Sequence, residues 1–493
     1  MVSFGGARDL EYELQLLTAI RAATVDGVPL THLTLDGRHN LWHRFEQYVF
    51  SSDIVRFSAT KSFDQYLTSE GGQSTAVSLK GLVVGLVGVV ISGLAVLSML
   101  VVKPKVIVFG IDRVSDAEYK SDFRMHAIYS FLKTRHVRHT EILHTVFNKG
   151  FIYNLLKRLR FAIYLEAADT LYAIGRALWR TRPKQITIEN LGSLSDEEAR
   201  FVRYVIKKYL GQKDAALFRI SLLTFILSAS RAKAIFAIDD ARHYHDICVA
   251  AHHAEVPVYA FQHGHYTRFH VGWLAQQEVR GAYIRPDFLV VWSEFWRHEL
   301  KRLGSVFDDA SILIGSPEKK SVSLPSVQSQ THRTILIPHE TDSPKLEMVK
   351  ILQEIISDPT TVIVLKLRPD HTPQSQIQEY PSLAIDGERI KTITNSGKLQ
   401  YRPACAVGVY STFLYDMVEA GIPVGVLVDV SPYGHGMVEN GLANAIHSHA
   451  LHADIGDLCT LSDNELQRRR TLLTDGVLPL TETLERIART IQI

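Results

Sequence analysis

The sequence predicts an α/β protein with two Rossmann-like domains facing across a cleft and an N-terminal membrane-associated extension. Short apolar, β-branched runs alternate with helical patterns from residue 106 onward, which is typical of βαβ units around a parallel sheet. The alternation stops in a polar Ser- and Gln-rich stretch, residues 318–333, and then restarts. The chain has 493 residues, more than one hydrophobic core normally serves.

Composition narrows the class of protein. Apolar residues make up 46% of the chain and charged residues 22%, as in folded globular proteins. Lys plus Arg number 54 against 52 Asp plus Glu, and this balance argues against a nucleic-acid partner, which needs a broadly basic surface. The three cysteines are far apart and form no CxxC pair, so we expect neither a disulfide framework nor a structural zinc site. The same pattern indicates a reducing compartment.

The first 102 residues precede the regular alternation. Residues 9–23 and 41–57 have helical apolar spacing, and residues 1–80 are predicted to form a small α/β or helical module. Residues 81–102 are uncharged between Lys80 and Lys103, and this length spans a bilayer as a helix. A buried helix and a hairpin in one leaflet are the alternatives. We expect the protein at the cytoplasmic face of the membrane, with the core against that surface.

Residues 103–317 are predicted to form the first Rossmann-like domain. Strands are expected at residues 106–110, 139–146, 185–191, 234–238, 256–261, 286–293 and 311–317. Between them lie a long basic helical stretch, residues 149–187, and a helix over residues 195–211 with a capping box of Ser195 and Glu198. The basic stretch suits an anionic membrane face or a pyrophosphate-linked ligand. The alternative is an ordinary amphipathic core helix with a basic solvent side.

Residues 334–493 are predicted to form the second Rossmann-like domain after the 318–333 linker. Strands are expected at residues 334–340, 361–369, 404–411 and 423–430, with helices over residues 344–358 and 412–421 and at the end of the chain.

Ionisable residues gather where two strands of the first half end. Parallel sheets bind ligands beyond the carboxyl ends of their strands. Asp239 and Asp240 end one such strand, and either is a candidate general base, although Asp240 could simply cap the next helix. The next strand ends in a Gln-His-Gly-His turn, with His263 as a further catalytic candidate and the other three as candidates for hydrogen bonding to sugar hydroxyls: Gln262, Gly264 and His265. The histidines of the intervening helix are expected mostly at the surface: His243, His245, His252 and His253.

Three strand ends of the second half indicate a nucleotide pocket. Hydroxyl groups and free backbone N–H groups at a helix N-terminus bind phosphate, and a strand leads directly into a helix that opens with Ser and Thr. An Asp one turn later could bind ribose hydroxyls, and basic and His/Glu residues end the neighbouring strands. The candidate nucleotide-binding residues are His339, Glu340, Lys366, Arg368, Ser411, Thr412 and Asp416.

Other site classes lack their motifs. There is no HExxH and no spaced Cys/His set, so we expect no protein-held metal. The P-loop motif GxxxxGK[ST] is absent, and no GxGxxG follows the first strand. The sequence therefore argues against a P-loop ATPase and against an enzyme that binds a nicotinamide dinucleotide.

The segments "YAFQHG", "VLKLRP" and "YSTFLYDMVEAGIP" resemble the GT-B glycosyltransferases of bacterial capsule and lipopolysaccharide assembly. The resemblance covers roughly residues 104–450. It implies a nucleotide-sugar donor held by the second half, a glycan or lipid-linked acceptor, and no cofactor. It assigns Arg368 with Pro369 to a basic turn, Ser411 and Thr412 to phosphate, and Asp416 to the sugar or ribose. It also implies that the turn of Gln262, His263 and Gly264 faces the acceptor, so that Gln262, Gly264 and His265 are the candidate acceptor-binding residues. The sequence departs from the family pattern at Arg368, where His is usual, and at Asp416, where Glu is usual.

The implied reaction is attack of an acceptor hydroxyl on the anomeric carbon with loss of the nucleotide. Two other functions fit the same fold. One is a sugar-nucleotide epimerase, which would need no membrane segment. The other is a non-catalytic subunit of a polysaccharide assembly complex, which the departures at Arg368 and Asp416 would suit.

Overall fold

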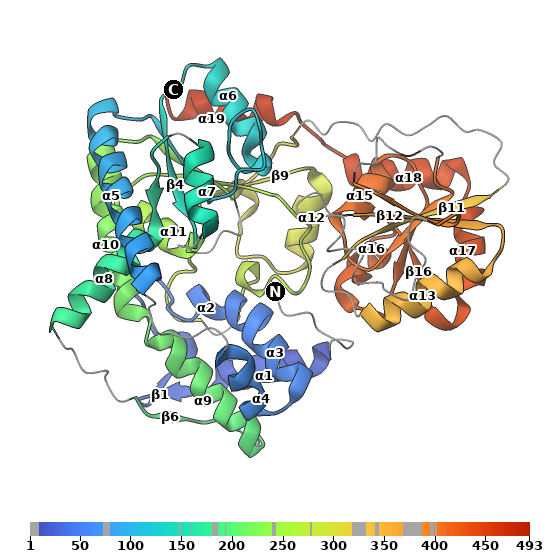
Figure 1. Cartoon of the computed structure of the whole chain (residues 1–493), viewed down its shortest axis with the longest axis horizontal. Coiled ribbons are helices and arrows are strands. Elements are labelled where there is room, and N and C mark those ends of the chain that lie inside the picture. Colours follow the sequence, from blue (N-terminus) through green and yellow to red (C-terminus); the bar gives the residue numbers. More distant parts are fainter. Residues whose placement is uncertain are drawn as a thin grey trace.

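Two parallel sheets form the centres of the two domains in this computed structural model. The structure describes residues 9–71, 79–146, 149–158, 160–179, 186–192, 194–238, 243–276, 279–317, 332–340, 345–367, 387–394, 399 and 402–493. In Figure 1 the first domain and an N-terminal module lie on the left, and the second domain lies on the right.

The first sheet has seven parallel strands in the order β10-β9-β8-β7-β3-β4-β5. Its order is that of a doubly wound Rossmann sheet, and the direction of winding changes between β3 and β7. Alternate residues of β3 enter two different cores, so both faces of the sheet are covered, which explains its uninterrupted apolar runs. The strands are β3 (Val106–Ile111), β4 (His139–His144), β5 (Ile163–Tyr164), β7 (Ala234–Ile238), β8 (Val258–Phe261), β9 (Phe288–Val291) and β10 (Ile312–Ile314).

The second sheet has six parallel strands in the order β13-β12-β11-β14-β15-β16, again with the Rossmann order and a switch point between β11 and β14. The two Rossmann-like domains predicted from the sequence are therefore confirmed. The strands are β11 (Arg333–Pro338), β12 (Thr361–Lys366), β13 (Ile390–Ile393), β14 (Cys405–Gly408), β15 (Val424–Leu427) and β16 (Asn444–Ile446).

Helices cover the two sheets. Those of the first domain are α5 (Leu79–Val102), α6 (His126–Thr134), α7 (Lys149–Arg158), α8 (Leu165–Trp179), α9 (Asp196–Leu210), α10 (Lys213–Ser230), α11 (Tyr244–His253) and α12 (Glu294–Arg302). Those of the second part of the chain are α13 (Lys345–Ser357), α15 (Thr412–Glu419), α16 (His435–Glu439), α17 (Leu451–Cys459), α18 (Asp463–Thr474) and α19 (Leu480–Thr490). The capping box expected at Ser195 and Glu198 is present and starts α9.

The N-terminal module contains α1 (Leu10–Ala22), α2 (His43–Tyr48), α3 (Val55–Thr60) and α4 (Phe63–Gly71). A small antiparallel sheet joins β1 (Thr24–Val25), β2 (Val28–Pro29) and β6 (Ile188–Glu189). The strand expected at residues 185–191 thus pairs within this module and not within the first Rossmann sheet. The module shares one hydrophobic core with the first domain.

The basic stretch 149–187 is not one helix. It forms α7, the short strand β5 and α8. Two of its arginines make internal ion pairs: Arg158 with Asp112 at 3.0 Å and Arg160 with Glu141 at 2.6 Å. These two arginines therefore stabilise the first domain, because each forms an ion pair with a buried carboxylate.

The apolar segment 81–102 lies within α5. Within the described residues, one helical stretch, Val83–Val102, is long and apolar enough to cross a membrane, with a mean hydropathy of 2.5, and 28% of it is buried. One side of α5 packs on the first domain, where the hydroxyl of Ser92 accepts the backbone N–H of Tyr164 at 3.0 Å. The other side exposes a row of apolar residues, including Val90 and Val101.

The last helix, α19, returns to the first domain. The sequence-based division placed residues 334–493 in the second domain, and α19 is a correction to it. The reason is the apolar stripe of α19: Leu480, Leu484 and Ile487 are buried in the same core as Val106 and Val108 of β3. Figure 1 accordingly shows α19 beside α6, away from the other C-terminal helices.

Loops at the carboxyl ends of the two sheets touch each other. The ring of Phe269, in the loop after β8, lies 4.5 Å from the ring of Tyr433, which follows β15. The indole of Trp296 lies 4.9 Å from the ring of Tyr415 on α15. The rims that parallel sheets use for ligands therefore meet at the junction of the two domains.

Candidate functional site

The switch point of the second sheet brings together the ends of β11 and β14. Ligands of doubly wound sheets bind in the crevice at such a point. His339 and Glu340 follow β11 directly, and both are buried, at 4% and 5% exposure. Ser411 and Thr412 follow β14 and open α15. Two of the strand ends singled out in the sequence therefore lie side by side.

The carboxylate of Glu340 sits in a ring of backbone donors. It accepts the N–H groups of Val409, Tyr410 and Ser411 at 2.8, 2.7 and 2.5 Å. Burial raises the pKa of the Glu340 carboxyl to about 7, although the three N–H groups oppose that shift. The turn after β14 is thus an anion-binding turn, and in this structure its anion is a side chain of the protein itself.

The remaining donor candidates surround this turn. The Ser411 hydroxyl accepts the N–H of Phe413 at 3.3 Å, so it caps α15. The Lys366 ammonium lies 5.0 Å from the centre of the Phe413 ring, which places a cation at the first turn of α15. Asp416 is partly exposed on α15. Arg368 lies outside the described residues.

The turn after β8 is held by Gln262. Its side-chain N–H donates to the carbonyl of Gly264 at 2.8 Å, and its carbonyl oxygen accepts the N–H of Trp292 at 2.9 Å. Gln262 is 6% exposed, so it shapes the turn, and its contact with an acceptor stays a prediction. A Cβ on Gly264 would meet nothing within 4 Å, so the glycine leaves this loop surface open.

His265 reaches the second domain. Its ring lies 5.6 Å from the ring of Tyr415 on α15. Burial, with smaller contributions from His270 and His263, lowers the pKa of His265 to about 3, so this imidazole is neutral at physiological pH. Its Nδ1 atom is buried and has no hydrogen-bond partner among the described residues. A buried polar atom without a partner at a domain junction favours a ligand contact there.

His263 is partly buried in the same turn. The two carboxylates Asp239 and Asp240 lie outside the described residues. The catalytic roles predicted for these three residues therefore stay predictions.

A second group of polar residues lies at the rim of the first sheet, where β3, β4 and β5 end. The imidazole Nδ1 of His144 is hydrogen-bonded to one carboxylate oxygen of Glu166. The other oxygen accepts the N–H of Thr145 at 3.0 Å. Both side chains are only slightly exposed, 12% for His144 and 14% for Glu166. The carboxylate thus fixes the imidazole and leaves Nε2 as its basic nitrogen, which is how histidine general bases are oriented.

Burial would raise the pKa of the Glu166 carboxyl, but the contacts with His144, His243 and the N–H of Thr145 hold that pKa below its usual value. Glu166 is therefore ionised. His243, at the start of α11, lies 3.8 Å from it, and burial lowers the pKa of His243 to about 4. His243 is 10% exposed, which corrects the expectation that it lies at the surface.

A pocket of about 400 Å³ opens beside this pair. Asp112, at the end of β3, lines it and is bound by Arg158 at 3.0 Å and by the Thr145 hydroxyl at 3.0 Å. The pocket has polar and apolar walls, lined by Ile111, Asp112, Arg113, Val114, His144, Thr145, Val146, Gly150, Phe151 and Asn154. Its size and mixed lining suit a small polar substrate such as a sugar.

The sequence contains a signal for this group. His144 lies near the end of the strand predicted at residues 139–146, and Asp112 follows the strand predicted at residues 106–110 by two positions. The strand-end argument applied to residues 239–265 applies equally to them. Glu166 carries no such signal, because β5 is only two residues long.

Two groups among the described residues could hold a metal ion: His144, Glu166 and His243 at this rim, and Asp36, His39 and His253 elsewhere. At the rim, the Glu166 oxygens are already committed to His144 and to the backbone of Thr145. This arrangement orients the His144 imidazole for proton transfer.

An apolar groove of about 380 Å³ lies between α5, α8 and α10. Its lining is almost wholly apolar, with Val96, Leu97 and Leu171 among its members and Arg219 as its charged member. Arg219 donates to Asp246 at 2.7 Å. Glu166 is on the same helix, α8, as the groove residues Ala167 and Ala168, so the groove and the His144–Glu166 pair are neighbours.

No protein-family model and no curated protein matches the chain. Among solved structures it is similar to the calicheamicin glycosyltransferase CalG4, at 11% identity and a TM-score of 0.48, over 79% of this chain and 98% of that one. It is also similar to the UDP-GlcNAc 2-epimerase of Neisseria meningitidis bound to UDP-GlcNAc, at 14% identity and 0.42, over 78% and 99%. MurG of Acinetobacter baumannii matches at 12% identity and 0.42, over 78% and 99%. All three TM-scores are below 0.5, and the assignment of the two domains rests on their strand orders.

Proposed function

We propose that this protein is a glycosyltransferase of the GT-B type that moves a sugar from a nucleotide-sugar donor to a lipid-linked or surface-glycan acceptor. The observation that carries the proposal is the turn after β14, whose three N–H groups converge on an anion at the switch point of the second sheet. A turn built for an anion, beside a lysine and a Ser/Thr-led helix, suits the phosphates of a nucleotide.

In this proposal Glu340 organises the turn, and the donor phosphates lie next to it at the first turn of α15. Ser411, Thr412 and Lys366 would contact them, with Arg368 as a further cation and Asp416 near the sugar or ribose. The positive end of the helix and Lys366 would stabilise the charge that develops on the leaving phosphate. His339 would line the same pocket. No cofactor is needed for this step.

The His144–Glu166 pair supplies a base on the first domain. His144 Nε2 would remove the proton from an acceptor hydroxyl as the oxygen attacks the anomeric carbon and the carbon–phosphate oxygen bond breaks. The nucleotide then leaves with both electrons of that bond, and the ionised Glu166 stabilises the imidazolium. Asp239, Asp240 and His263, predicted as catalytic from the sequence, stay alternative candidates for this role.

The acceptor chemistry follows from the groove beside the base. An apolar groove lined by the chain neighbours of Glu166, Leu165 and Ala167, would hold an alkyl chain while the attached sugar enters the polar pocket. The apolar side chains around it are exposed to solvent in this structure, among them Val101 at 82% and Phe225 at 66%. Such a patch marks an interaction surface. We propose that it lies on the cytoplasmic face of a membrane.

Contact of the α5–α8–α10 surface with a membrane differs from α5 crossing the membrane as a spanning helix. One side of α5 is bound to the first domain along Ser92, Ala95 and Met99, which are buried. A helix packed in this way offers its outer face to the acyl chains and stays with its domain. In Figure 1 α5, α8 and α10 form the side of the first domain away from the second domain.

The test of the transferase uses the full chain, UDP-, GDP-, CMP- and CDP-sugars, and a polyprenyl-diphosphate-linked monosaccharide in detergent. We expect one donor to raise the midpoint of thermal unfolding and its sugar to appear on the lipid. Conversion of a donor to its epimer without transfer would instead show an epimerase. No thermal shift and no turnover with any donor would support a non-catalytic subunit.

The test of the membrane face is co-sedimentation with vesicles of phosphatidylglycerol and phosphatidylcholine. Val101→Asp places a charge in the exposed apolar row of α5 and should reduce the bound fraction. Leu346→Asp is the matched control, because Leu346 is 66% exposed on α13 of the second domain. Equal binding of wild type and Val101→Asp would contradict this orientation.

A further inference from the structure

A cluster of histidines and a carboxylate joins the N-terminal module to the first domain at a place that the proposed reaction does not use. Asp36 and His39 lie in a loop of the module, between the bridged residues Thr34 and Asn40. His253 is the last residue of α11. The start of α11 is at the substrate rim, and its ten residues span about 15 Å, so His253 lies near the opposite edge of the sheet.

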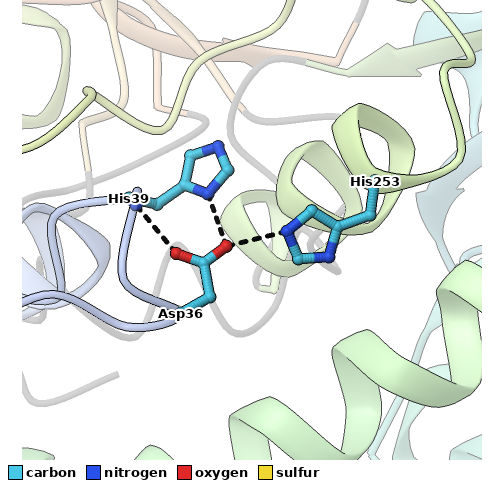
Figure 2. A group of neighbouring side chains, drawn as sticks. All are labelled: Asp36, His39 and His253. Carbon is cyan, nitrogen blue, oxygen red and sulfur yellow. Dashed lines mark hydrogen bonds and ion pairs between the residues drawn. The ribbon is translucent and has the colours of Figure 1, made fainter.

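One carboxylate oxygen stands between two imidazoles. Asp36 Oδ2 is 2.7 Å from His39 Nδ1 and 2.8 Å from His253 Nε2, and Figure 2 shows the carboxylate between the two rings. Asp36 Oδ1 accepts the backbone N–H groups of His39 at 2.8 Å and Arg38 at 3.1 Å. The loop therefore holds Oδ2 toward the histidines without using it for the backbone.

His252 and Asp287 lie on the side of His39 away from Asp36. His39 Nε2 lies 3.2 Å from His252 Nδ1, and His252 Nε2 lies 3.6 Å from Asp287 Oδ1. Asp287 is itself fixed, because its other oxygen accepts the N–H of Val258 at 2.8 Å. The order of groups is thus carboxylate, imidazole, imidazole, carboxylate.

The two imidazole nitrogens that face Asp36 Oδ2 come from different parts of the chain, His39 from the module and His253 from α11. One carboxylate oxygen and two imidazole nitrogens that face one another in this way form a ligand set that a divalent cation can bridge.

When a cation is bound to His39 Nδ1, the ring proton of His39 is on Nε2. His39 Nε2–H donates to His252 Nδ1, and His252 Nε2–H faces Asp287. Metal-bound histidines generally donate their second N–H in this way, and the second partner fixes the ring.

We propose that Asp36, His39 and His253 bind a divalent zinc-type cation that fastens the N-terminal module to the first domain. Two imidazoles and one carboxylate are ligands that Zn²⁺ prefers, and a water can complete a tetrahedral set because His253 is 38% exposed. Tetrahedral zinc would hold the donor atoms about 3.3 Å apart, so the two contacts of Asp36 Oδ2 need lengthen by only about 0.5 Å each. The C-terminal end of α11 also favours a positive charge there.

The test uses the full chain, stripped with chelator, desalted and then titrated with ZnCl₂ alone. We expect about one retained zinc per chain by elemental analysis and a rise of about 3 °C or more in the midpoint of thermal unfolding. His253→Gln and Asp36→Asn should each weaken zinc binding at least tenfold and abolish the rise. His253 is partly exposed at a helix end, so its variant keeps the test valid even if Asp36→Asn fails to fold.

Two controls separate this site from others. His449→Gln removes an 80% exposed histidine near Asp429 and should retain zinc like the wild type. His144→Gln addresses the rim cluster and should also retain it. A wild type without retained zinc, retention by His253→Gln and Asp36→Asn alike, or loss in His144→Gln with retention in His253→Gln would each overturn the proposal.

Discussion

Replacing Glu340 by Gln should change how the stability of the second domain depends on pH. Glu340 is 5% exposed, and burial raises the pKa of its carboxyl in the folded protein to about 7 from an ordinary value of 4.5. Between these two values the folded chain binds more protons than the unfolded chain. The free energy of unfolding therefore falls as the pH rises through this window.

The size of the effect follows from the shift. A difference of roughly 2.5 pH units, at 1.36 kcal/mol per unit, amounts to about 3 kcal/mol. This stabilisation of the protonated form is present below about pH 4.5 and lost above about pH 7. Glu340→Gln keeps an oxygen for the N–H groups of residues 409–411 but carries no titrating charge, so it should lack this dependence. Relative to the wild type, it should become more stable by about 3 kcal/mol between pH 4.5 and pH 8.

The assay is thermal unfolding of wild type and Glu340→Gln across this pH range, read at the transition of the second domain. For a domain of this size, about 3 kcal/mol corresponds to roughly 6–12 °C in the difference between the two midpoints. Glu354→Gln is the control, because this glutamate of the same domain is 58% exposed. Midpoints of wild type and Glu340→Gln that run parallel across the range, or that diverge in the opposite direction, would refute the reasoning.

Three further changes test the site and the domain assignment. His144→Gln should lower kcat by about 10²- to 10⁴-fold with unchanged donor affinity in calorimetry, whereas His452→Gln, which alters a 43% exposed His–Glu pair, should leave kcat unchanged. Ala168→Phe should narrow the α5–α8–α10 groove and slow sugar transfer to a polyprenyl-linked acceptor, while hydrolysis of the donor should persist. An equal loss of both reactions would argue against the groove as the acceptor site. Leu484→Ala removes a fully buried side chain of α19 and should cost the first domain about 2–5 kcal/mol in chemical denaturation, against less than about 0.5 kcal/mol for the exposed Leu346→Ala. A loss confined to the second-domain transition would contradict the position of α19.

Much of the fold could be predicted because its signals are local. Apolar runs such as residues 234–238 and 405–408 are buried on both faces of a parallel sheet, and their apolar composition indicates this burial without knowledge of the neighbouring strands. The capping box of Ser195 and Glu198 lies within one turn of helix, and it was predicted for the same reason. The lengths of the short strands β5 and β6 carried too little signal, and β6 pairs in a different sheet from the one expected.

The candidate site was predicted in part. His339, Glu340, Ser411 and Thr412 come from strand ends, and parallel strands bring such ends to one edge. What Glu340 does there was not predictable, since its contact with the turn at 409–411 joins residues about 70 positions apart. The pairing of His144 with Glu166 was likewise not predictable, because it depends on where α8 begins relative to β4.

The sequence by itself determined the two parallel sheets, the apolar helix at 81–102 and the chemical groups at the strand ends, because periodicity and composition act over a few neighbouring residues. The tertiary structure alone decided which groups meet. Long-range packing brought α19 back to the first sheet, laid α5 along α8 and α10, turned the carboxylate of Glu340 into the turn after β14, and set His253 of α11 against the loop of Asp36. Each of these contacts joins segments distant in the chain, and the free energy that forms them comes from burial and hydrogen bonds that exist only once the domains have packed.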